Sequence, residues 1–114
     1  MVGEHRRHPK EAQLTSRFQM YLEKHHREVK RYRIMTGSAT LYSDLADLTE
    51  NILYEAKGSA DRMSVRLAIG QVLDYGRFVD GSRLAVLLPE EPHAADLVEL
   101  LVFKRPVLDQ WQVR

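Results

Sequence analysis

Asp44, Glu55 and Lys57 are the side chains whose types and spacing in this sequence suggest chemistry. Two carboxylates and an ammonium group on one patch would suit a hard divalent cation together with an anionic substrate. Oxygen ligands, and a chain without cysteine, favour Mg²⁺ or Mn²⁺ over zinc. A surface charge ladder, in which Lys57 bridges two exposed acids, fits the same spacing and stays open as the alternative.

The elements that would position these residues are the two strands of a hairpin. Residues 41–48 and 52–57 are strand-like runs, and the polar segment between them is short enough for a hairpin turn. If the hairpin is symmetric about Thr49 and Glu50, the numbers of opposed residues sum to 99, which places Asp44 across from Glu55. Two like charges so placed repel each other, so something must offset them.

Alternation along these strands assigns the faces. Lys57 lies two residues beyond Glu55 and therefore shares its face, where its charge opposes the repulsion between the two acids. Asp47 falls on the opposite face, unless a bulge in its strand exchanges it with Asp44. The sequence therefore predicts a patch built by Asp44, Glu55 and Lys57, with Asp47 as the substitute ligand.

The rest of the sequence predicts an α/β domain with one mixed sheet flanked by helices, in the order α-β-β-β-α-β-α, with a last edge strand as an option. The expected helices are residues 11–26, a segment from Ser59 or Asp61 to about residue 79, and residues 93–103. The expected strands are residues 29–35, 41–48, 52–57 and 83–88, with residues 107–114 as the edge strand. Val65, Ala68, Ile69, Val72 and Phe78 should face inward on the central helix. That helix should connect two parallel strands, and residues 83–88, apolar without alternation, should be covered on both faces.

Composition indicates one soluble domain over residues 1–114, with residues 1–9 as a flexible basic arm. Mean hydropathy is −0.40, and we expect no membrane span and no secretory leader. The lack of cysteine fits a cytoplasmic protein. Residues 1–33 hold nine basic and four acidic groups, a net charge of +5, while residues 34–114 hold eight and twelve, a net charge of −4. A basic front on an acidic body suggests a polyanion partner, although charge alone fits a solvated helix equally well.

Asp44 and the run Glu55-Ala56-Lys57, within this order of elements, resemble the motif of the PD-(D/E)XK nuclease superfamily, with Ser43 where the motif has proline. Gln71 and Tyr75 resemble the Q-x-x-x-Y motif of its RecB-like branch and are four residues apart, on one helical face. The resemblance covers residues 41–89. Outside it, Glu11 matches the acidic position often found in the family's first helix. Apart from the family, Tyr75 would simply pack in the core and Gln71 would lie at its edge.

The resemblance implies a restriction-endonuclease-like fold and metal-dependent hydrolysis of phosphodiester bonds in DNA or RNA. We favour DNA as the substrate, and the choice between the two stays open. Asp44, Glu55 and the backbone carbonyl of Ala56 would bind Mg²⁺ or Mn²⁺, and Glu11 would reach the ion through water. Lys57 would orient the attacking water and neutralise phosphate charge, with Gln71 and Tyr75 beside it. A bound metal would supply a nucleophile near neutral pH. Two alternatives stay open: a catalytically silent nucleic-acid-binding or scaffolding domain of the same fold, and an unrelated interaction module with the two acids on different faces.

Four arginines are candidates for contacts with nucleic acid. Arg62 and Arg66 stand at the start of the central helix, directly after the strand that holds Glu55, where a helix N-terminus favours anions. Arg31 and Arg33 alternate on the first strand and could contact phosphates. A domain of this size has little surface for recognition, so we expect a homodimer or a separate recognition subunit.

Overall fold

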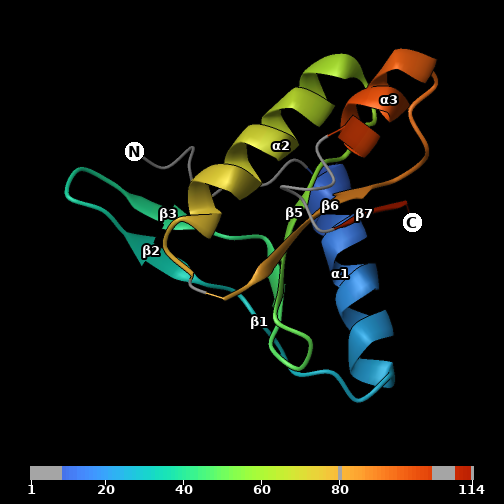
Figure 1. Ribbon diagram of the computed structural model, residues 1–114. Helices are drawn as coiled ribbons and strands as arrows, with labels where there is room; N and C mark the ends of the chain where they lie inside the picture. Colours follow the sequence, from blue (N-terminus) through green and yellow to red (C-terminus); the bar gives the residue numbers. More distant parts are fainter. Residues whose placement is uncertain (1–8, 80, 104–109, 114) are drawn as a thin grey trace.

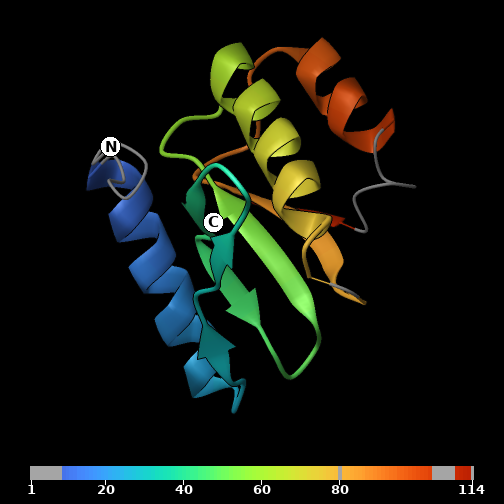
Figure 2. The same ribbon diagram turned by 90° about the vertical axis from the view of Figure 1, so that its left-hand side faces the viewer.

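Helices cover both faces of a central sheet in the computed structural model, which describes residues 9–79, 81–103 and 110–113 (Figure 1, Figure 2). The helices are α1 Pro9–Lys24, α2 Arg62–Gly76 and α3 Ala95–Phe103, and the strands are β1 Val29–Lys30, β2 Arg33–Met35, β3 Thr40–Tyr42, β4 Leu45–Asp47, β5 Ile52–Ala56, β6 Arg83–Leu88 and β7 Gln110–Val113. The α/β class with a mixed sheet between helices is therefore as the sequence predicts.

Five strands form the main sheet, in the order β1-β4-β5-β6-β7. The pairs β1·β4 and β4·β5 are antiparallel, whereas β5·β6 and β6·β7 are parallel. The parallel pairing of β5 and β6 through the α2 crossover is confirmed. The helix between the two strands returns the chain to the end of the sheet where β5 began, so β6 runs in the same direction. The last edge strand is also present as β7.

One face of the sheet packs on α1. Helix α1 contributes Leu14, Phe18 and Leu22 at helical spacing, and these side chains contact the residues of β4, β5 and β6 that point to this face of the sheet. On the strands these are Leu45, Ile52, Tyr54, Ala56, Ala85 and Leu87. Period-two alternation then sends the residues between them to the other face.

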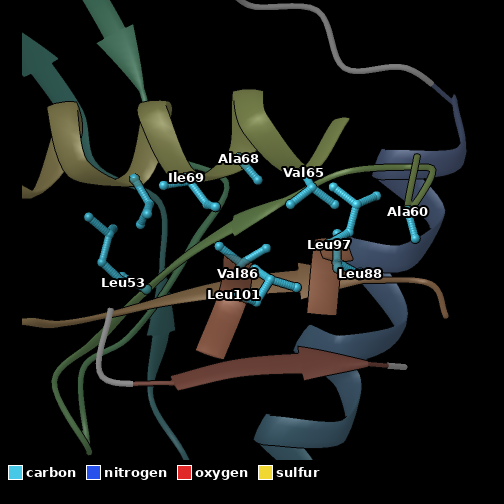
Figure 3. Close-up of a cluster of buried hydrophobic side chains, with 11 residues drawn as sticks. Leu53, Ala60, Val65, Ala68, Ile69, Val86, Leu88, Leu97 and Leu101 are labelled. Atoms are coloured by element: carbon cyan, nitrogen blue, oxygen red, sulfur yellow. The ribbon is translucent and has the colours of Figure 1, made fainter. Parts of the chain in front are cut away.

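The opposite face packs on α2 and α3 (Figure 3). Val65, Ala68, Ile69 and Val72 of α2 are buried there, as predicted, against strand residues such as Leu53, Val86 and Leu88 and against Leu97 and Leu101 of α3. Phe78 contradicts its prediction: α2 ends at Gly76, and this ring is 42% exposed. Because β6 contributes to both clusters, its burial on two faces is confirmed.

Two predicted strands are each interrupted, which corrects the expected three-strand order. Residues 29–35 divide into β1 and β2, and residues 41–48 divide into β3 and β4, so that β2 and β3 form a separate two-stranded sheet. The cause is Ser43, which is fully buried at the break. Its hydroxyl accepts the Tyr32 N–H at 2.8 Å and its carbonyl accepts Arg31 Nε at 2.9 Å, and these bonds replace a regular ladder.

Helix boundaries differ from prediction by a few residues. Helix α1 begins at Pro9, a residue favoured in the first helical turn, and ends before His26, whose φ is 63°. Asp61, and not Ser59, is the N-cap of α2: its Oδ1 accepts the Ser64 N–H at 2.8 Å. Helix α3 begins at Ala95 rather than residue 93. Residue 9 is thus helical, and the rest of the predicted basic arm lies outside the described residues.

Within the described ranges, no helix has the length and apolar character needed to cross a bilayer.

Candidate active site

Asp44 and Glu55 meet where β4 begins and β5 ends. The pairs Leu45↔Tyr54, Ala46↔Leu53 and Asp47↔Ile52 confirm the predicted register, which brings Asp44, the residue before β4, to the position opposite Glu55. Asp44 Oδ2 accepts the backbone N–H of Ala56 at 2.8 Å. That bond holds the Asp44 side chain against the last residue of β5, beside Glu55.

Glu55 is a buried carboxyl group with an unmet hydrogen-bonding capacity. It is 4% exposed, and its Oε1 atom accepts no hydrogen bond from the described residues. Burial raises the pKa of Glu55 well above its ordinary value, and the charge of Asp44 and a hydrogen bond with it raise this pKa further. The ammonium group of Lys57 acts in the opposite direction, and Glu11 adds a smaller upward effect.

Lys57 lies between carboxylates from two different elements. Its Nζ atom is 4.0 Å from Glu55 Oε2 on β5 and 3.6 Å from Glu11 Oε1 on α1. Asp44, Glu55 and Lys57 are 7%, 4% and 9% exposed, so the surface-ladder interpretation, which required exposed acids, is wrong. Three acids around one lysine leave a net charge of −2 when all four groups are ionised.

Gly58 brings α1 to this cluster. A β-carbon at Gly58 would lie 2.8 Å from Lys10 Cβ and 3.1 Å from the backbone nitrogen of Glu11. Only a residue without a side chain permits that approach, which sets Glu11 within reach of Lys57. In the sequence, the glycine directly after Glu55-Ala56-Lys57 is the signal that could have predicted this approach.

Asp47 is committed to a structural role on the other face of the sheet. It is fully buried, it pairs with Arg27, and its Oδ1 atom accepts the N–H groups of Thr49 and Glu50 at 3.0 and 3.1 Å. These bonds close the turn between β4 and β5. No bulge exchanges it with Asp44, since the register is continuous through Asp47↔Ile52.

Gln71 and Tyr75 lie on α2, which covers the face of the sheet to which Leu53 and Glu55 point. Tyr75 is half-buried and packs against the α2 core cluster. Gln71 Oε1, like Glu55 Oε1, is buried and accepts no hydrogen bond from the described residues. The contacts of these two residues fit packing at the core edge, and no hydrogen bond joins Gln71 to the carboxylate pair within the described chain.

The four arginines differ in their surroundings. Arg62 is bound to Asp96 of α3, with Nη2 2.6 Å from Oδ2, and both side chains are exposed. Arg31 bonds the Ser43 carbonyl and lies over the ring of Tyr42, 5.0 Å from its centroid. Arg33 and Arg66 are exposed, and neither forms an ion pair with a described residue. The first two arginines therefore have structural partners, whereas Arg33 and Arg66 face solvent. Among the residues that the structure describes, Arg33 Nη2 donates a hydrogen bond only to the exposed Met35 Sδ, at 3.9 Å.

The oxygen atoms of Asp44, Glu55 and Ala56 would suit a hard cation that takes only a few of its ligands from the protein. Among the described residues no group of three or more His, Cys, Asp or Glu side chains is arranged so that it could hold a metal ion by itself, so the site is not an all-protein cage. Mg²⁺ is commonly held by one or two carboxylates, with water and substrate oxygens completing the shell. Asp44, Glu55 and the Ala56 carbonyl match that pattern: the Ala56 N–H points to Asp44, and the N–H and C=O of one strand residue point to the same side.

Comparison with known proteins gives no relative: no protein-family model, no curated protein and no solved structure matches the chain.

Proposed function

We propose that this chain is a metal-dependent nuclease that hydrolyses phosphodiester bonds in nucleic acid, DNA rather than RNA, with Mg²⁺ or Mn²⁺. The observation that supports it best is Glu55: a buried carboxyl with one unpartnered oxygen, next to a second buried carboxyl. Buried networks built only for structure usually satisfy their polar atoms. A cation beside Glu55 Oε1 would provide the missing partner and offset the repulsion from Asp44.

Asp44, Glu55 and the Ala56 carbonyl would hold this ion, with Glu11 reaching it through water. Once bound, the ion would lower the pKa of a coordinated water and neutralise charge that develops on a phosphate. Asp44 needs no rearrangement for this role, because the Ala56 N–H already fixes its carboxylate at the end of β5.

Lys57 would bind the scissile phosphate and orient the attacking water. Its ammonium group is held by Glu55 and Glu11, at 4.0 and 3.6 Å, which are loose ion-pair distances. A phosphate oxygen can therefore become a third partner without displacing a short hydrogen bond. Glu11 is a positioning residue in this scheme, since its carboxylate on α1 holds the ammonium group of Lys57 in place.

Exposed cations support a nucleic-acid substrate. Arg33 and Arg66 face solvent, and residues 29–43 hold three basic residues and no acidic one. Contacts of this kind neutralise phosphates and make affinity depend on salt. We further propose a cytoplasmic protein that acts as a homodimer or with a recognition subunit, because one domain of 114 residues offers little surface for selecting a sequence.

The test is a cleavage assay on the whole chain. Linear duplex, circular and single-stranded DNA, with matched RNA, are incubated with Mg²⁺, with Mn²⁺, and with EDTA. We expect cleavage with either metal and none with EDTA. Glu55→Gln and Lys57→Met should abolish cleavage, while Lys24→Met, on the exposed last turn of α1, should cut like the wild type.

Three results would overturn the proposal. Binding without cleavage on every substrate would favour the catalytically silent nucleic-acid-binding domain. Neither binding nor cleavage would favour an unrelated interaction module. Cleavage that persists in EDTA, or in Glu55→Gln, would remove the metal site from the mechanism.

A further inference from the structure

We propose that the hairpin of β2 and β3 is an arm that enters a groove of double-stranded nucleic acid and holds the duplex at the site. The arm comprises residues 31–43 and projects from the body of the molecule (Figure 1). This inference rests on the proposed function, and it adds the form of the substrate and the element that binds it.

Charge singles out the arm. Residues 29–43 contain three basic residues, Lys30, Arg31 and Arg33, and no acidic residue, although the chain after residue 33 has a net charge of −4. All three basic side chains are exposed. A basic segment without acids suits a polyanion such as nucleic acid.

The two faces of the arm differ. Arg31, Arg33 and Met35 alternate along one face and are exposed, with Met35 at 67% exposure next to the hairpin turn. Tyr32 and Ile34 occupy the other face, where Ile34 is buried and Tyr32 packs against the α2 core cluster. The basic face is therefore held outward, and an exposed apolar side chain lies at its end.

Hydrogen bonds fix the arm at both ends. At its base, Ser43 bonds the backbone of Tyr32 in both directions, with its N–H donating to Tyr32 O at 3.0 Å and its hydroxyl accepting the Tyr32 N–H at 2.8 Å. At its tip, Thr36 Oγ1 accepts the N–H groups of Ser38 and Ala39 at 3.2 and 2.8 Å. Little conformational freedom is then left to lose on binding, which favours affinity.

The shape of the arm favours a duplex over a single strand. A two-stranded ribbon fits the major groove of B-form DNA, which is about 12 Å wide. Binding of single strands usually depends on open aromatic rings on which bases stack. The Tyr42 ring on the arm is covered by the Arg31 guanidinium, 5.0 Å from its centroid. The arm also ends at Ser43, the residue before Asp44. A duplex bound to the arm would therefore lie close to the carboxylate pair.

A binding assay on the full chain tests the arm. The double variant Arg33→Ala with Met35→Ala is compared with Arg17→Ala with Met20→Ala, which removes an exposed pair of the same residue types from α1. Affinity for a 20-base-pair duplex, and for each of its single strands, is measured in EDTA by fluorescence anisotropy between 50 and 200 mM salt. Losing one phosphate contact should weaken duplex binding about fivefold at physiological salt and reduce the salt slope by about one. The α1 pair and the single-strand affinities should change less than twofold.

A crosslinking test does not depend on affinity. The chain has no cysteine, so Met35→Cys and Met20→Cys each give one attachment point for a photo-crosslinker. Met35→Cys should crosslink to the duplex and Met20→Cys should not.

Four outcomes separate the hypotheses. If the wild type binds duplex and cuts it, but the arm variant and the α1 variant weaken duplex binding equally, the proposed role of the arm is overturned. Equal losses of duplex and single-strand binding would overturn its preference for duplex, and so would crosslinking to single strands alone. A wild type that neither binds nor cuts would overturn the proposed function itself, whatever the arm variants do.

Discussion

Replacing Glu55 with glutamine should remove a pH dependence of stability from the metal-free protein. Burial and the neighbouring Asp44 raise the pKa of Glu55 in the folded chain, whereas in the unfolded chain this residue titrates near its ordinary value of about 4.3. Between these two pKa values the folded chain keeps a proton that the unfolded chain has released. The free energy of unfolding therefore falls as pH rises through this window, and the stability is fully present only below the unfolded pKa.

The slope can be worked out. Inside the window one extra proton on the folded state lowers the free energy of unfolding by about 1.4 kcal/mol for each unit of pH. For a domain of this size that corresponds to roughly 6 °C in Tm per unit of pH. Glu55→Gln keeps the size and neutrality of the protonated carboxyl, so its stability should match the wild type near pH 4 and exceed it increasingly at higher pH.

The assay is urea unfolding in EDTA at half-unit intervals from pH 4 to pH 8. Glu28→Gln is the matched control, since it makes the same chemical change on an exposed side chain and should shift the curve by less than about 0.5 kcal/mol without changing its slope. Parallel curves for the wild type and Glu55→Gln would refute the raised pKa. A wild type that gains stability relative to Glu55→Gln as pH rises would show that Glu55 has a depressed pKa and is satisfied without a cation.

Three further predictions concern the site and its supports. Mn²⁺ or Mg²⁺ at a hundredfold excess over its Kd should raise the free energy of unfolding by about 2.7 kcal/mol at pH 7.5, measured as a higher Tm. Glu55→Gln should lose most of this gain. Equal gains for the variant and the wild type would show that the ion binds elsewhere. Gly58→Ala should lower the free energy of unfolding in urea by about 1–3 kcal/mol, because the new β-carbon would lie 2.8 Å from Lys10 Cβ. The control Gly70→Ala, whose β-carbon would have nothing within 4 Å, should leave this free energy unchanged or raise it by up to about 1 kcal/mol. Equal effects of the two changes would refute the close approach of α1 to Gly58. Arg27→Met should lower the same free energy by about 1–3 kcal/mol, because it leaves buried Asp47 without its guanidinium partner, and no loss would show that the two backbone N–H bonds satisfy Asp47 by themselves.

Local pattern in the sequence determined the hairpin register, the β5-α2-β6 crossover and the inward face of α2. Each depends on residues close together in the chain: the short polar turn sets which residue of β4 opposes which residue of β5, and helical spacing sets which side chains of α2 meet the sheet. The juxtaposition of Asp44 and Glu55 follows from the same register. The resemblance to a nuclease family named the residues but could not supply their burial.

Contacts between distant parts of the chain decided the rest. Ser43 interrupts two strands because it bonds Arg31 and Tyr32, and that interruption creates the arm. Alternation already placed Asp47 on the other face, and only the structure shows that it is paired there with Arg27, twenty residues earlier. Glu11 reaches Lys57 only because Gly58 admits α1 at the end of β5. The pKa of Glu55 depends on how completely the packed helices and sheet exclude water from its carboxyl, and no property of the neighbouring sequence fixes that.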